Sequence, residues 1–71
     1  MNATPAQQQV DKFNEDNAIG TPVSYWPGLR EGTGRDSFTT TPAWVMGGHS
    51  AMVTVDGYSG GIALSHVKAI W

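Results

Sequence analysis

Two histidines are the residues of this chain best suited to proton transfer or metal binding. His49 is followed by Ser50, and His66 is preceded by Ser65. A serine nucleophile needs a base within hydrogen-bonding reach, whereas neighbouring residues on a strand point to opposite faces. The pattern therefore predicts no catalytic residue: His49 is expected in a turn, and His66 is expected to be partly buried and bonded to backbone.

A metal site is disfavoured by the number and spacing of candidate ligands. Structural zinc needs four protein ligands and catalytic zinc needs three. The chain has two histidines, no cysteine and no HxH or HxxxH spacing. Asp36 and Asp56 are the acidic residues that could join the histidines, and no spacing supports them. We therefore expect no metal and no cofactor.

The stretch GLREGTGR, residues 28–35, is the chain's nearest approach to a phosphate-binding loop. It lacks the lysine of the GxxxxGK[ST] motif, and a strand rather than a helix is expected after it. The dinucleotide fingerprint GxGxxG is also incomplete. Two interpretations stay open. The stretch is a plain hairpin connection with glycines for backbone freedom, or it contacts a protein through Leu29, Arg30 and Arg35.

The chain has three tryptophans, two tyrosines and two phenylalanines, more aromatic side chains than a small core encloses. Trp26 alternates out of phase with Val23 and Tyr25, and Trp71 is the last residue, so one or both are expected at the surface. Exposed Trp beside Arg is typical of protein interfaces. The alternative is that these rings cover the core from outside, for instance under an N-terminal helix. The predicted partner-binding residues are Trp26, Leu29, Arg30, Arg35 and Trp71.

Composition narrows the classes of protein. A chain of 71 residues forms one domain with a small core, which self-association to a homo-oligomer would help to stabilise. Four scattered Lys and Arg residues and a net charge of −2 disfavour nucleic-acid binding, leaving only weak contact through Arg30, Arg35 and Lys68. No apolar run approaches a membrane span, and the N-terminus does not resemble a signal peptide. The absence of cysteine fits a cytoplasmic protein.

Helix signals are confined to the start of the chain. Thr4 is a suitable N-cap, and Gln7 stands at the capping-box position three residues later. A helix is expected from Pro5 to Asp16, with Asn17 and Gly20 as its candidate stop residues. Its apolar stripe consists of Ala6, Val10 and Phe13.

From Thr21 onward apolar residues alternate with period two, in the short segments PVSYW, AWVM, AMVTV, IALS and VKAIW. A long first loop and glycine-rich turns, GGHS and DGYSGG, separate them. The segment LSHVKAI is expected to hold a helical turn capped by Ser65. This order predicts a mainly β fold: an SH3-like antiparallel barrel of about five strands over residues 21–71, preceded by a helix and linker over residues 1–20. The competing architecture is an open meander covered by the helix.

The blocks YWPGLREG, AWVMGGH and GGIALSHV together resemble small proteins encoded by phages and prophages of bacteria. The resemblance implies a non-enzymatic accessory protein in the cytoplasm of a bacterial host. It also implies binding to a host or phage protein. The function expected from it is inhibition of a host protein, including anti-CRISPR-like inhibition of a defence component.

The chain is also similar in length and expected fold to the plasmid-borne type II dihydrofolate reductases. These are SH3-like barrels that form tetramers around a pore binding folate and NADPH. Their Val-Gln-Ile-Tyr-Pro-Val block corresponds to residues 62–67. Ala63 and Ser65 stand at the Gln and Tyr positions and cannot make the same contacts. The resemblance in fold and self-association still makes an oligomeric reductase-like enzyme the alternative to a protein-binding module.

Overall fold

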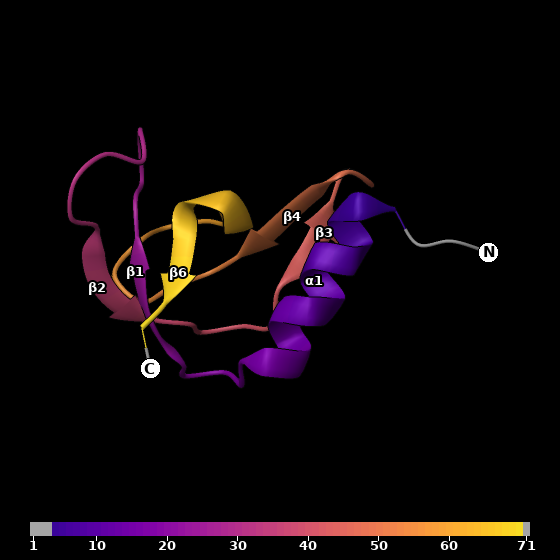
Figure 1. Cartoon of the computed structure of the whole chain (residues 1–71), viewed down its shortest axis with the longest axis horizontal. Coiled ribbons are helices and arrows are strands. Elements are labelled where there is room, and N and C mark those ends of the chain that lie inside the picture. The colour runs from indigo at the N-terminus through magenta and orange to yellow at the C-terminus, as the bar shows by residue number, and fades with distance from the viewer. Residues whose placement is uncertain (1–3, 71) are drawn as a thin grey trace.

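The computed structural model describes residues 4–70 and shows one helix packed beside two small sheets (Figure 1). The prediction of a small, mainly β protein with an N-terminal helix is confirmed, with six strands in the described residues where about five were expected. The elements in chain order are α1 (Pro5–Asp16), β1 (Pro22–Tyr25), β2 (Arg35–Phe38), β3 (Trp44–Met46), β4 (Ser50–Val53), β5 (Ile62–Ala63), the 3-10 turn η1 (Leu64–His66) and β6 (Val67–Ala69).

The ends of α1 are set by local hydrogen bonds. The Thr4 hydroxyl oxygen accepts a bond of 3.1 Å from the backbone N–H of Gln7. The capping box is only half made, because the Gln7 side chain donates to Asp11 at 2.8 Å instead of returning to the cap. At the other end, the N–H of Asn17 donates to the carbonyl of Phe13 at 2.9 Å. The predicted boundaries of the helix are confirmed.

Replacing Thr4 with alanine removes the cap, and we expect the free energy of unfolding to fall by about 1 kcal/mol. Thr4→Ser keeps the accepting oxygen and is the matched control, with an expected change below about 0.5 kcal/mol. Denaturant unfolding followed by circular dichroism measures both variants. Equal losses in the two would show that the hydroxyl oxygen is not what stabilises this end of the helix.

The strands form two antiparallel sheets, in the orders β2-β1-β6 and β3-β4-β5. The stretch 35–46 contributes to both sheets, first as β2 and then as β3, with a bend between them. One isolated antiparallel bridge, between Thr39 and Val55, joins the end of the first sheet to the chain after β4. The described strands do not pair into a closed ring, so the closed barrel expected from the sequence is not found.

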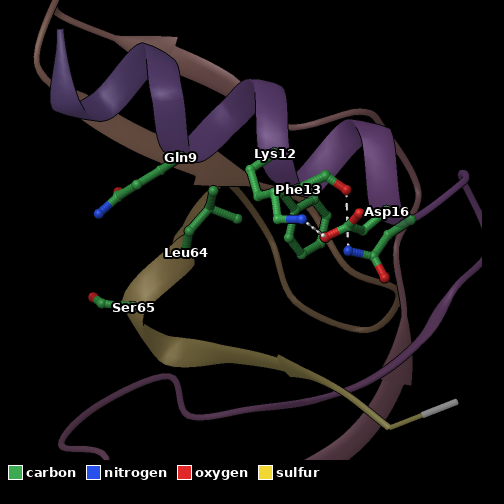
Figure 2. Close-up of a pocket in the computed structure, with 7 residues that line it drawn as sticks. Gln9, Lys12, Phe13, Asp16, Leu64 and Ser65 are labelled. Atoms are coloured by element: carbon green, nitrogen blue, oxygen red, sulfur yellow. Dashed lines mark hydrogen bonds and ion pairs between the residues drawn. The ribbon is translucent and has the colours of Figure 1, made fainter.

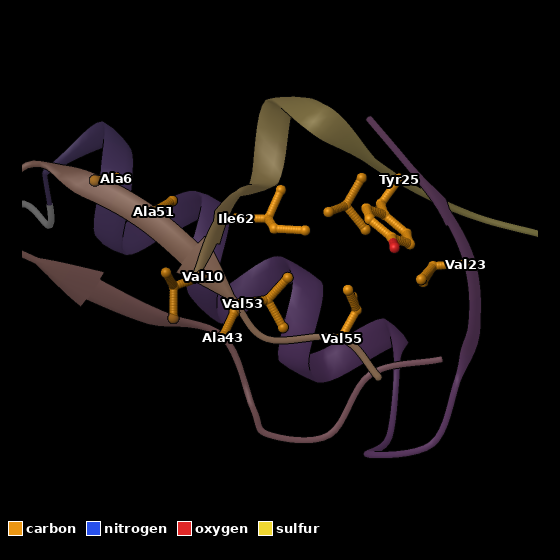
Figure 3. Close-up of a cluster of buried hydrophobic side chains, with 10 residues drawn as sticks. Ala6, Val10, Val23, Tyr25, Ala43, Ala51, Val53, Val55 and Ile62 are labelled. Carbon is orange, nitrogen blue, oxygen red and sulfur yellow. The ribbon is translucent and has the colours of Figure 1, made fainter. Parts of the chain in front are cut away.

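The hydrophobic core lies between the two sheets and against α1 (Figure 3). Val23 from β1 and Val53 from β4 are fully buried, one from each sheet. The ring of Tyr25 meets that of Tyr58 edge-on, with 6.0 Å between the ring centroids. Along β1 and β4 the core residues alternate with less buried positions, as the period of two predicted. Its members are Ala6, Val10, Val23, Tyr25, Ala43, Ala51, Val53, Val55, Ile62 and Val67.

A reciprocal pair of hydrogen bonds joins α1 to the chain before β3. The Asn14 side-chain Nδ2 donates to the carbonyl of Ala43 at 3.0 Å, and the Ala43 N–H donates to Asn14 Oδ1 at 2.8 Å. Ala43 is buried, so the Asn14 amide satisfies both backbone groups where no strand lies alongside. Together with buried Ala6 and Val10, this contact makes the helix part of the same core as the sheets.

The turns form at the glycine-rich segments, as the sequence predicted. Gly47 and Gly48 connect β3 to β4 with φ of 63° and 80°, a region that favours glycine. His49 lies in this turn, as expected, and its side chain is exposed. The 3-10 turn before the last strand also forms, but Ser65 lies inside it and no side chain caps it at Ala63. The predicted capping role of Ser65 is therefore wrong.

Candidate functional site

The loop that joins β1 to β2, residues 26–34 and called here the Trp26 loop, projects from the first sheet on the side away from α1 (Figure 1). It carries three of the predicted contact residues: Trp26, Leu29 and Arg30. Trp26 directly follows buried Tyr25, so strand alternation places its side chain on the outer face of the sheet. The ring does not lie under the N-terminal helix.

The Trp26 ring is fixed by the far end of its own loop. Its indole Nε1–H donates to the carbonyl of Gly32 at 3.2 Å. The ring also lies against Gly34, where an added Cβ would come within 2.8 Å of the Trp26 Cε2 atom and 2.9 Å of the Tyr25 carbonyl oxygen. Only a residue without a side chain allows this approach. The ring is half-buried as a result.

Arg30 covers the exposed side of the ring and links the loop to η1. Its guanidinium carbon lies 4.4 Å from the centroid of Trp26, within cation–π range. Its Nη1 donates to the carbonyl of Ser65 at 2.9 Å. The backbone N–H of Trp26 donates to the carbonyl of His66 at 3.0 Å, and the His66 Nδ1 lies 3.1 Å from the Trp26 carbonyl oxygen. The predicted partial burial and backbone bond of His66 are confirmed.

Leu29 is the part of the loop that stays open to solvent. It is 80% exposed, the highest exposed fraction among the large apolar side chains of the described residues. Its carbonyl accepts a bond of 2.9 Å from the N–H of Glu31, which closes a tight turn centred on Arg30. The other two predicted contact residues of the loop, Trp26 and Arg30, bind each other. The loop therefore presents the apolar side chain of Leu29 to solvent.

Arg35 does not belong to the same face as Trp26. It is the first residue of β2 and pairs with Tyr25, whose side chain points to the core. Strand alternation therefore directs Arg35 to the side of the sheet opposite Trp26, where it is exposed at the sheet edge. The structure brings Trp26, Leu29 and Arg30 together and separates Arg35 from them. Trp71 lies outside the described residues.

A groove that sequence reasoning missed lies between α1 and η1 (Figure 2). Its volume is about 340 Å³. Phe13 and Leu64 give it an apolar lining and also pack against the core. At the rim, Lys12 pairs with Asp16 at 3.1 Å. The hydrogen bond to Asp16 and the charge of that carboxylate raise the pKa of the exposed Lys12 ammonium. The sequence signals for this groove were the apolar residues Phe13 and Leu64. They belong to two separate elements, α1 and η1, which only the fold brings together.

The side chains considered for metal binding do not cluster in the described residues. No three His, Asp or Glu side chains converge on a point that could hold a metal ion within residues 4–70. Ser65 is exposed within η1, and the ring of the adjacent His66 is directed to the Trp26 carbonyl.

Residues 62–67, the stretch compared with the reductase pore, do not form a single strand in this structure. Ile62 in β5 and Val67 in β6 are buried members of the core. Residues 64–66 form η1 between them, so the stretch is not one continuous strand. Ala63 is half-buried and Ser65 is exposed.

Comparisons with known protein families, with curated proteins and with solved structures returned no match.

The longest helix, α1, has 12 residues, and no helix in the described part of the chain combines the length and apolar character needed to cross a membrane.

Proposed function

We propose that the chain is a non-enzymatic protein-binding module with an SH3-like barrel arrangement, and that the Trp26 loop is its contact surface. Three features support the barrel assignment. The stretch 35–46 bends to serve both sheets, a 3-10 turn precedes the last strand, and that strand pairs with the first one. The bridge between Thr39 and Val55 lies where the two sheets meet.

The observation that carries the proposal is the contrast between Leu29 and the rest of its loop. Leu29 is 80% exposed, while the loop beneath it is held by the Gly32, Ser65 and His66 carbonyls. A loop that is already ordered loses little conformational entropy on binding, which favours affinity. In this proposal Leu29 is the anchor that enters a partner's pocket. Trp26 and Arg30 are positioning residues that hold the loop in its binding conformation.

The partner in this proposal is a protein of a bacterial host, and binding inhibits it. The support is the resemblance of the YWPGLREG, AWVMGGH and GGIALSHV blocks to proteins encoded by phages and prophages. Such a protein acts in the host cytoplasm, where defence proteins are potential targets.

Leu29→Asp tests the contact directly. We expect this substitution to weaken binding of a purified partner by at least about tenfold, because a charge then enters an apolar pocket. The partner is first identified by affinity capture from host cells and mass spectrometry, and its affinity is then measured by calorimetry. Thermal stability should stay nearly unchanged, because Leu29 contributes little to the core.

Ile19→Asp is the matched control, because Ile19 is also an aliphatic residue with a large exposed fraction, 62%. It precedes β1, whereas the Trp26 loop follows that strand. Its affinity for the partner should remain within about twofold of the original chain. Equal binding by the Leu29→Asp and original chains would remove Leu29 as the anchor. Equal weakening by both substitutions would point to an apolar surface wider than the Trp26 loop.

A further inference from the structure

The outer face of the sheet β2-β1-β6 carries three rows of side chains, each running across the strands. Continuing the registers of the two ladders defines them. The backbone bonds from Ile70 to Pro22 and from Trp26 to His66, both 3.0 Å, confirm the continuation on the β6 side, and the contact of the Trp26 ring with Gly34 supports it on the β2 side. The rows are Phe38–Pro22–Ile70, Asp36–Ser24–Lys68 and Gly34–Trp26–His66.

The first row is an apolar strip open to solvent. Phe38 is 45% exposed and Ile70 is 47% exposed, and exposed Pro22 lies between them. The core-facing residues of the same strands, Val23 and Tyr25, are buried on the other side. No described element covers the strip.

The second row places opposite charges on either side of β1. Asp36 in β2 and Lys68 in β6 both pair with Ser24. They are separated by two strand spacings, about 10 Å, which is too far for a direct ion pair within one chain. Neither forms an ion pair within residues 4–70, where the salt bridge is that of Lys12 with Asp16. The row therefore has a negative charge on one side of β1 and a positive charge on the other. A second surface with these two charges in the reverse order would complement it.

We propose that this outer face binds the same face of a second copy of the chain around a two-fold axis that runs along β1. Such an axis exchanges the two outer strands, so β2 of one copy lies over β6 of the other. Asp36 then faces Lys68 of the second copy, twice by symmetry. In the neighbouring row, Phe38 faces Ile70 of the second copy, and the two prolines meet near the axis.

Charge selects this axis over the other one that face-to-face packing allows. A two-fold axis perpendicular to the strands through Ser24 would place Asp36 opposite Asp36 and Lys68 opposite Lys68. Like charges held face to face oppose association. The pattern on this face is therefore self-complementary in one arrangement only.

The expected dimer is weak and reversible. The two rows described contribute six side chains per copy, and the same axis sets the Gly34–Trp26–His66 row against its own copy. The whole face still offers fewer than the roughly 20 residues a side of a stable interface. We therefore expect a dissociation constant of about 100 μM, which falls as ionic strength falls. The Trp26 loop lies at the end of this face, and Leu29 remains available for a different partner. The dimer and the proposed function can therefore fail independently.

A charge-swap cycle followed by sedimentation velocity tests the proposal, with protein from about 10 μM to 1 mM in about 50 mM salt. Asp36→Lys and Lys68→Asp should each weaken self-association at least tenfold, because like charges then face each other across the axis. The double variant restores opposite charges and should associate within about threefold of the original chain. Circular dichroism verifies that every variant is folded.

Glu31→Lys is the control for net charge, because it makes the same change of +2 as Asp36→Lys but belongs to none of the three rows. It should leave the dimer unchanged within about twofold. A chain that stays monomeric at 1 mM would overturn the proposal. A double variant no better than the two single ones would overturn it as well, since it would show that the two charges do not meet.

Discussion

Replacing Gly34 with alanine should lower the free energy of unfolding by about 2–3 kcal/mol. The added Cβ would come within 2.8 Å of the Trp26 Cε2 and 2.9 Å of the Tyr25 carbonyl oxygen. The ring cannot rotate away without breaking the bond from its Nε1 to Gly32 and its stacking with Arg30. The carbonyl belongs to the end of a central strand and cannot shift without moving its neighbours. For a domain of this size the loss corresponds to a fall in Tm of about 10–20 °C.

Gly28→Ala is the matched control in the same loop. Its added Cβ has no heavy atom within 4 Å, and its φ lies outside the left-handed region. We expect stability to stay within about 0.5 kcal/mol or to rise slightly, because alanine restricts the unfolded chain. Denaturant unfolding followed by tryptophan fluorescence measures both variants. Equal stability of the two would mean that Trp26 does not pack on Gly34 in solution, and the positioning role given to Trp26 would fall with it.

Replacing Asn14 with alanine should cost about 2–3 kcal/mol of unfolding free energy. The substitution removes two hydrogen bonds and leaves both the N–H and the carbonyl of Ala43 without their partner. Ala43 is only 6% exposed, so water does not readily replace the lost amide. Alanine favours the helix more than asparagine does, by under 1 kcal/mol, and this gain offsets only part of the loss.

Glu15→Ala is the control for that helix effect. Glu15 is an exposed neighbour on α1, and we expect its substitution to change stability by less than about 0.5 kcal/mol. Thermal and denaturant unfolding of the two variants compares them directly. If Asn14→Ala is as stable as Glu15→Ala, the helix is held by its apolar contacts alone, and the Asn14 amide is not needed for docking.

These two sites have different consequences for binding. The Gly34 substitution acts on the platform beneath Leu29, so a loss of partner affinity should accompany its loss of stability. The Asn14 contact lies between α1 and the chain before β3, away from the Trp26 loop. Well below its Tm, the Asn14 variant should bind the partner almost as well as the original chain. The comparison separates loop positioning from general stability.

Features that depend on near neighbours in the chain were predictable. The N-cap at Thr4 and the turn at Gly47 and Gly48 follow from side-chain and backbone preferences within a few residues. The burial of Val53 and Val55 on one face follows from the two-residue period of a strand. The outward phase of Trp26 relative to Tyr25 follows from the same period.

Features that join distant parts of the chain were not predictable. The pairing of Asn14 with Ala43 and of Arg30 with Ser65 spans 29 and 35 residues. Neither asparagine nor arginine has a pattern that names its partner. The capping role expected of Ser65 failed for a related reason. The 3-10 turn is bonded to the Trp26 loop from outside, so its position does not depend on a cap.

The N-terminal helix and the short strands joined by glycine-rich turns follow from the sequence, because propensity, capping and alternation act locally. The role of Trp26 depends on contacts between distant parts of the chain. Register placed Gly34 beside its ring, and loop closure brought Arg30 over it and onto η1. Register likewise placed Asp36 and Lys68 on either side of Ser24. Those arrangements arise because strand pairing and core packing select one set of long-range contacts, which no short window of sequence contains.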